Sequence, residues 1–164
     1  MTNKLFLTIA CLGVVLTLSA CIENIYKAAE WTMDIGESEA WKTQALQGDA
    51  EAQYKVGQLY CCGERPRYDN IKALYWFCMA AKQGQRDAMF EVGNMYENEH
   101  RYKGSVIPRD PVLAYTYYML AVAQGNDGAV SPYNMLKETL TNEEQDRATA
   151  IFKQWPNIPC EVTR

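Results

Sequence analysis

The stretch GDAEAQYKVGQLYCCG, residues 48–63, returns 36 residues later as GQRDAMFEVGNMYENE, residues 84–99. A second pattern comes after each copy: DNIKALYWFCMAAKQG from Asp69 returns 41 residues later as DPVLAYTYYMLAVAQG from Asp110. Self-similarity at a period of about 20 to 50 residues is the signature of repeat proteins, whose units pack only against their neighbours. The sequence therefore predicts a stack of repeated units.

The first part of each unit has the pattern of a helix. Apolar residues recur at helical spacing from Ala52 to Tyr60, and Gly63 ends the pattern. Glycine inside a helix costs about 1 kcal/mol relative to alanine. Its presence at both Gly57 and Gly93 therefore indicates that a neighbouring helix approaches closely at this position.

The second part of each unit also predicts a helix. Asp69 and Asp110 are good N-cap residues because a carboxylate can accept hydrogen bonds from the free amides of the first turn. Pro111 suits the first helical position, and Gly84 suits the end of a helix. Five aromatic residues fit the apolar i, i+3, i+4 spacing and are assigned to the core: Tyr75, Trp76, Tyr115, Tyr117 and Tyr118.

A third unit begins after the second but departs from the pattern. Ser-Pro at residues 131–132 is expected to break the start of its first helix, and Asn134 stands where the earlier units have glycine. Residues 141–155 predict a capping helix, because Thr141 and Glu144 have the spacing of a capping box, and an apolar stripe follows at Ala148, Ile151, Phe152 and Trp155.

The motifs AxAQYxxGxxY and AxxWxxxAAxQG, joined by an aspartate, resemble the Sel1-like repeat, a bacterial relative of the tetratricopeptide repeat. The resemblance covers residues 37–136, with Trp41, Ala45 and Gly48 similar to the end of an earlier second helix. It implies an all-α fold: a short α-solenoid of antiparallel helix hairpins, with two full repeats, partial flanking ones and a C-terminal capping helix. The expected boundaries are a signal peptide (1–20), a tether and N-terminal helix (21–36), the repeat domain with its capping helix (37–155) and a tail (156–164).

The N-terminus predicts secretion. Lys4 precedes an uncharged, largely apolar run at residues 5–18, which is shorter than the roughly 20 residues of a membrane-spanning helix. The sequence LSAC at residues 18–21 resembles the bacterial lipobox, which implies cleavage before Cys21 and its acylation. Since Ile22 replaces the aspartate that favours the inner membrane, we expect a lipoprotein on the periplasmic face of the outer membrane. An ordinary signal peptide with a chance cysteine is the alternative.

The cysteines predict a disulfide. If Cys21 is acylated and the signal is removed, four cysteines remain, and an even set in an oxidising periplasm favours disulfide bonds. Adjacent cysteines rarely bridge each other, so we expect Cys61 or Cys62 to pair with Cys160. A bond from the other one to Cys78 is less favourable, because Cys78 lies about two turns into its helix. A metal site is disfavoured, because the adjacent pair lacks the usual two-residue gap.

Charge and motifs narrow the possible functions. The net charge is −4 without a basic block, and phosphate binding needs clustered cations, so nucleic acid is not expected as a partner. Motifs for a nucleophile, a phosphate loop or a cofactor are missing, and His100 is expected to be a solvated loop residue. Glu91, Glu97 and Glu99 are expected to face solvent. We therefore expect no enzyme activity, no catalytic residue, no metal and no cofactor.

Protein binding is what the repeats favour. Stacked helix hairpins expose a concave surface, lined in the resembling family mainly by the first helix of each unit. Tyr54 and Gln58 fall opposite the buried side of their helix, as do Phe90 and Asn94 in the next unit, and are our candidate binding residues. Alternatively, the two rings pack between neighbouring helices.

The loop at residues 97–109 is the most individual feature of the sequence. It carries Arg101 and Tyr102, which we include among the candidate binding residues, although a solvated basic loop is equally common. The family resemblance implies an immunity lipoprotein that neutralises a secreted toxin, such as a type VI lipase effector. A scaffold or adaptor of the cell envelope is the alternative, and a β-lactamase-like enzyme is a remote one.

Overall fold

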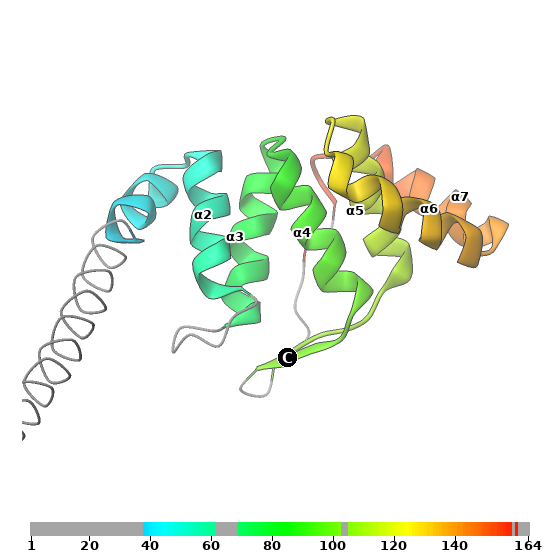
Figure 1. Ribbon diagram of the computed structural model, residues 1–164, viewed down its shortest axis with the longest axis horizontal. Coiled ribbons are helices and arrows are strands. Elements are labelled where there is room, and N and C mark those ends of the chain that lie inside the picture. The colour runs from blue at the N-terminus through cyan, green and yellow to red at the C-terminus, as the bar shows by residue number, and fades with distance from the viewer. Residues whose placement is uncertain (1–37, 62–68, 103–104, 159, 161–164) are drawn as a thin grey trace, which may run out of the picture. The chain divides into compact units, whose positions relative to one another are not determined.

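Figure 1 shows the computed structural model, which is largely helical. The structure describes residues 38–61, 69–102, 105–158 and 160, without the side chains of residues 101 and 102. The predicted signal peptide, the whole predicted tether with Cys21, and Cys62 lie outside these residues. No helix within the described ranges is long and apolar enough to cross a membrane.

The chain divides into two compact units, residues 1–40 and 41–164. In the first unit, the described residues 38–40 are helical. In the second unit, residues 41–46 are helical, and each later helix packs on the next: α2 on α3, α3 on α4, α4 on α5, and α5 on both α6 and α7. The predicted all-α solenoid of helix hairpins is confirmed. The helices are α2 (Ala50–Tyr60), α3 (Asn70–Lys82), α4 (Arg86–Glu97), α5 (Pro111–Ala123), the short 3-10 helix η1 (Asp127–Ala129), α6 (Val130–Thr139) and α7 (Asn142–Phe152).

The predicted N-caps of α3 and α5 are confirmed. The side chain of Asp69 accepts a hydrogen bond in the first turn of α3, and Asp110 does the same in α5. Their backbone amides also donate to carbonyl oxygens in the last turns of the preceding helices, Asp69 to Tyr60 at 2.9 Å and Asp110 to Tyr96 at 2.8 Å. One residue therefore both starts the second helix of a repeat and fixes it to the first.

A Gln-Gly turn separates successive units. Gly48, Gly84 and Gly125 have φ angles of 98°, 91° and 81°, a region that favours glycine. The residue after each glycine caps the next helix with its side chain: Asp49, Gln85 and Asn126. Because all three turns are built in the same way, the third unit begins as the first two do.

The two helix glycines make room for an aromatic ring, as the sequence predicted. A Cβ atom on Gly57 would collide with the ring of Phe77, and one on Gly93 would lie 2.5 Å from Cε1 of Tyr118. Both rings are fully buried. Each hairpin is therefore closed by a ring of its second helix seated on the backbone of its first.

The expectation that residues 131–132 break the first helix of the third unit is wrong. Helix α6 begins at Val130 and continues through Pro132. Proline is tolerated there because amides of the first turn have no partner within the helix. The unit still differs from the others, since Asn134 replaces the glycine and Leu136 is the one residue of α6 that is fully buried.

Helix α7 covers α5, and the tail beyond α7 returns to α3. The predicted capping box of Thr141 and Glu144 is present, and Ala148 is buried. Trp155, which we expected on the apolar stripe of this helix, lies beyond its end and donates its indole N–H to the backbone oxygen of Ala81 on α3, at 3.4 Å. Ile158 is buried next along the tail.

The tail ends in a disulfide between Cys160 and Cys78 of α3, with the Cα atoms 6.1 Å apart. The predicted pairing of Cys160 with Cys61 or Cys62 is therefore wrong. Trp155 of the tail contacts Ala81 near the C-terminal end of α3. Cys160 of the same tail is bonded to Cys78, three residues earlier in that helix. Cys61 is half-buried at the end of α2.

The loop at 97–109 contains regular structure that the sequence analysis missed. Strands β1 (His100–Tyr102) and β2 (Ser105–Ile107) form an antiparallel hairpin, in which His100 pairs with Ile107. The β-branched residues Val106 and Ile107 suit a strand, and Ile107 is fully buried in the main core. The loop of the second unit therefore contains two short paired strands, anchored in the core by Ile107.

Candidate protein-binding face

The candidate residues lie at equivalent positions on two helices. Tyr54 and Gln58 are on α2, and Phe90 and Asn94 occupy the same positions on α4. Gln58 is exposed and the other three are half-buried. We call these four residues, together with the carboxylates of Glu51, Asp87, Glu91 and Glu97, the α2–α4 face.

The two rings of this face pack in the same way. Tyr54 lies against Phe77 with ring centroids 5.9 Å apart and a 40° tilt, and Phe90 lies against Tyr118 with the same distance and tilt. Gln58 donates a hydrogen bond to the Tyr54 hydroxyl at 2.8 Å. Each ring is thus packed against the core on one side and remains partly exposed on the other. The sequence had allowed either an exposed binding ring or a ring packed between helices, and the structure has features of both.

A polar network occupies the α4 side of the face. The Tyr118 hydroxyl lies 2.8 Å from Oδ1 of Asn94 and 2.6 Å from Oε2 of Glu97. Asn94 in turn donates from Nδ2 to Glu91 at 3.2 Å. The expectation that Glu91 and Glu97 are solvated is wrong, since both are half-buried, whereas Glu99 is exposed.

Burial and neighbouring charge set the ionisation of this face. Burial raises the pKa of Glu91, the hydrogen bond from Asn94 lowers it, and the nearby Asp87 raises it further. Burial, followed by the negative charges of Glu91, Asp87 and Glu51, raises the pKa of Tyr54 to about 12. Carboxylates from both α2 and α4 therefore contribute to the raised pKa of Tyr54.

Sequence reasoning missed Glu91, Glu97 and Tyr118 as residues of the face. The signal that identifies them is the repeat alignment. Tyr118 takes the place of Phe77 and so adds a buried hydroxyl, and Glu97 takes the place of Cys61 as its acceptor. A hydroxyl at a core position needs a partner, and the aligned change to glutamate supplies one.

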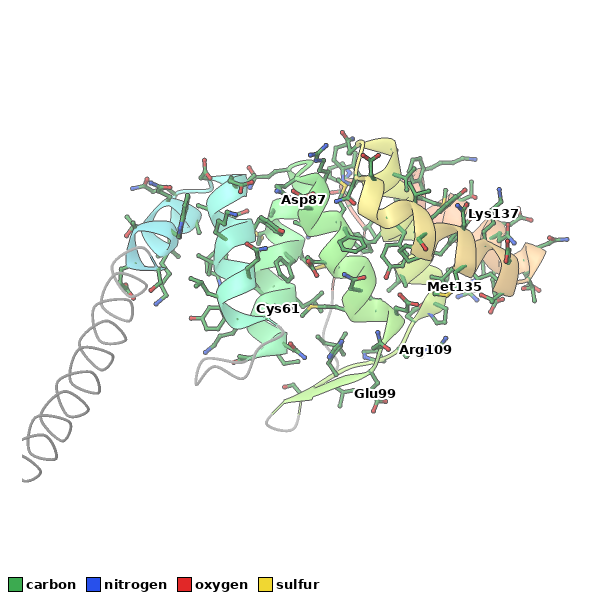
Figure 2. All side chains as sticks on the ribbon, in the orientation of Figure 1. Cys61, Asp87, Glu99, Arg109, Met135 and Lys137 are labelled. Carbon is green, nitrogen blue, oxygen red and sulfur yellow. A yellow bond between two sulfur atoms is a disulfide. The ribbon has the colours of Figure 1, made fainter. Side chains whose placement is uncertain are left out.

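The β1–β2 hairpin lies beside the end of α4. Arg101 and Tyr102 are on β1, where they pair with Val106 and Ser105 through the backbone. Arg109 comes after the hairpin and donates from Nε to the backbone oxygen of Glu97 at 3.1 Å. Figure 2 shows Arg109 and Glu99 near the C-terminal end of α4 and Asp87 at its N-terminal end.

His100 is not the solvated loop residue that we expected. It is half-buried, and its Nδ1 lies 2.7 Å from Nδ2 of the buried Asn70. Burial lowers its pKa. This pair joins the hairpin to the start of α3, so the histidine has a structural contact.

The aromatic residues of the second helices divide in two. Tyr115, Tyr117 and Tyr118 are buried as predicted, and Trp76 is half-buried against a small core of alanine and valine. The core assignment of Tyr75 is wrong, because its side chain is 58% exposed. The equivalent Thr116 of α5 is buried, and its hydroxyl lies 3.4 Å from the Ala148 backbone oxygen of α7. Helix α7 therefore covers this position in the second repeat, whereas the same position is exposed in the first.

The arrangement offers rings, amides and carboxylates for non-covalent contact. Within the described residues, no group of three or more His, Cys, Asp or Glu side chains is placed to hold a metal ion.

The sequence matches the Sel1 repeat family over residues 50–85 and 86–126. The two matches begin at the first residues of α2 and α4, so the family repeat and the structural repeat coincide. The chain contains two Sel1 repeats. Repeats of this family generally bind other proteins and are generally not enzymes.

Two similar proteins support the Sel1-repeat fold. A component of an ERAD-associated E3 ubiquitin-protein ligase from Arabidopsis thaliana, HRD3A, is 43% identical over 54 residues, which is 32% of this chain and 8% of that protein. The crystal structure of a protective antigen present in uropathogenic Escherichia coli strains, described as an SLR fold, superposes with a TM-score of 0.62 at 22% identity. It covers 71% of this chain and 24% of that one, so this chain spans only a small part of either relative.

Proposed function

We propose that this Sel1-repeat protein binds another protein through the α2–α4 face, without catalysis, and that acylated Cys21 anchors it to the periplasmic side of the outer membrane. The proposed partner is a secreted toxin, such as a type VI lipase effector, which it neutralises as an immunity protein. The observation that carries the proposal is the aromatic–amide pair repeated on α2 and α4, Tyr54 with Gln58 and Phe90 with Asn94.

The packing of these pairs supports a binding role. Each ring is fixed by a second ring of the core, at 5.9 Å in both repeats, and so loses little conformational freedom when a partner covers it. Rings that present a rigid, partly open surface are frequent anchors of protein interfaces. Two such rings in register suit a partner that spans both helices.

The cysteines support the proposed compartment. A bond between Cys78 and Cys160 fits an oxidising environment, because cytosolic proteins rarely keep structural disulfides. The lipobox-like sequence ending at Cys21 supports export by an independent route. Labelling with radioactive palmitate tests the anchor: the full chain should incorporate label and a Cys21→Ser variant should not. Unchanged labelling of the variant would refute lipidation at Cys21.

A tagged full-length chain, purified from envelope extracts of its source strain, tests the binding face. Mass spectrometry should find one dominant partner with the wild type, and the Tyr54→Ala/Phe90→Ala double variant should lose it. Tyr75→Ala is the matched control, since it removes an exposed ring from α3. By titration, the double variant should bind at least about 30-fold more weakly, as expected for two interface anchors.

The nature of the partner separates the two classes of function. For an immunity protein, periplasmic expression of the captured partner should stop growth of a test strain, and co-expression of the wild-type chain should restore it. Several weak partners with no toxicity would instead indicate an envelope scaffold. Loss of the partner with Tyr75→Ala and not with the double variant would place the interface elsewhere.

A further inference from the structure

Carboxylates line α4 along the candidate face. Asp87 is in its first turn, Glu91 in the middle and Glu97 at its end, and all three are half-buried. Glu51 of α2 adds a fourth, since its charge acts on the same Tyr54 ring as those of Asp87 and Glu91. Three of these carboxylates therefore act on the Tyr54 ring, and Glu91 follows Phe90 directly in the sequence.

The cations near this face are already engaged. Nζ of Lys55 lies 3.7 Å from Oε1 of Glu51. Nε of Arg86 lies 3.7 Å from Oδ1 of Asp87, and Nη1 of the same guanidinium donates to the backbone oxygen of Gly125 at 2.9 Å. These contacts place the two positive charges beside Glu51 and Asp87, and the Lys55 ammonium also lies 5.5 Å from the centroid of the Tyr54 ring.

The side chains that form hydrogen bonds with Glu91 and Glu97 are neutral. These bonds come from Asn94 and Tyr118. Among the described residues, no Lys, Arg or His nitrogen lies within 4.0 Å of a carboxylate oxygen of either glutamate. The two half-buried carboxylates are thus linked through Asn94 and the hydroxyl of Tyr118, and the ring of Tyr118 packs on Phe90.

We infer that the α2–α4 face takes an arginine-bearing segment of its partner, in which the guanidinium meets Glu91 and Glu97 and an adjacent apolar side chain covers Phe90. This inference rests on the proposed function and adds the chemistry of the partner. Arginine fits better than lysine, because its planar guanidinium can pair with two carboxylate oxygens and also stack on a ring. A phosphate-rich or acidic partner would be repelled by the same carboxylates.

Selection of random 12-residue peptides displayed on phage against the full chain tests this inference. The recovered peptides should be enriched in arginine next to aromatic or aliphatic residues. The best peptide is then synthesised, labelled and titrated by fluorescence polarisation, alongside a copy in which citrulline replaces arginine. Citrulline keeps the shape of the side chain without its charge, so it should bind at least about tenfold more weakly.

Variants of the chain locate the contact. The Glu91→Gln/Glu97→Gln double variant should weaken binding of the arginine peptide by at least about tenfold and reduce its dependence on salt. The matched control is Glu143→Gln, an exposed glutamate on α7, which should change neither. Far-UV circular dichroism should show that both variants are folded.

The remaining outcomes separate this inference from the proposed function. If the selected peptides lack cations, or if the double glutamine variant binds as well as the wild type, the inference is wrong. The proposed face stands in that case provided that Tyr54→Ala/Phe90→Ala still abolishes peptide binding. If the alanine variant also binds normally, both the face and its inferred partner chemistry are refuted.

Discussion

The two full repeats use the same pair of rings in opposite order. In the first repeat tyrosine is on the first helix and phenylalanine on the second, Tyr54 over Phe77; in the second repeat the order is reversed, Phe90 over Tyr118. The exchange moves a hydroxyl from the surface, where Gln58 meets it, into the interior, where Glu97 must accept from it. One backbone arrangement thus carries a neutral polar pair in one repeat and an acidic network in the next.

The Cys78–Cys160 disulfide ties the tail to the first repeat, and the second repeat has no equivalent cysteine. Loss of this bond should lower the stability more than any other change below. At the position of Cys78 the second repeat has Met119, which cannot form such a bond. A Cys160→Ser variant should unfold about 2–5 kcal/mol more easily in urea, because the bond closes a loop of 82 residues. Cys78→Ser is the control and should match the variant, because it removes the same bond. Equal stability of the oxidised wild type and the variant would contradict a structural role for the bond.

The helix glycines come next. Gly57→Ala and Gly93→Ala should each lower the unfolding free energy by about 1–3 kcal/mol, because the methyl group meets a buried ring. The loss at Gly93 should be the greater, since Tyr118 cannot move away without losing its contact with Glu97. Thermal unfolding measures both. Adding Phe77→Leu or Tyr118→Leu to the matching glycine variant should recover part of the loss, and failure to recover any would show that ring contact is not the cause.

The Tyr118→Phe variant gives the second repeat the phenylalanine that the first repeat has at the equivalent position, Phe77. Its unfolding free energy should fall by about 1–2 kcal/mol, because Glu97 and Asn94 lose the hydroxyl between them. Tyr54→Phe is the paired control and should cost less, since Gln58 is exposed and water replaces the lost contact. Equal losses in the two variants, measured by urea unfolding, would mean that the buried network adds nothing.

Glu91→Gln should have the smallest effect and the opposite sign. Burial raises the pKa of Glu91 above its unfolded value of 4.5, so its favourable contribution is complete below pH 4.5 and is lost as the pH rises through the folded pKa. At pH 7 the variant should therefore be more stable, by less than about 1 kcal/mol because the side chain is partly exposed. The gain should disappear at about pH 4, where the glutamate is protonated in both states. Lys55→Gln, the equivalent change in the first repeat, should bring no such gain.

Local rules made most of the repeat fold predictable. The N-caps at Asp69 and Asp110, the glycine turns and the close approach at Gly57 and Gly93 all depend on residues within one hairpin, and the same choices occur twice. The internal alignment showed which residues these were.

Long-range contacts explain what the sequence could not show. Tyr75 and Thr116 occupy the same position in their helices, yet one is exposed and the other buried, because α7 packs on α5 and covers Thr116. The pairing of Cys160 depends on the route of the tail beyond α7, which no local pattern describes. The acidic network likewise needs the distance between Tyr118 and Glu97, which lie on different helices.

The path of the tail limits where this array can gain a unit. Solenoids usually change length by gaining or losing a whole unit, since each one contacts only its neighbours. Here the end of the chain is bonded to α3, so a hairpin inserted between α3 and α7 would carry Cys160 away from Cys78. A descendant that gained a hairpin between these two elements would have to give up this covalent bond.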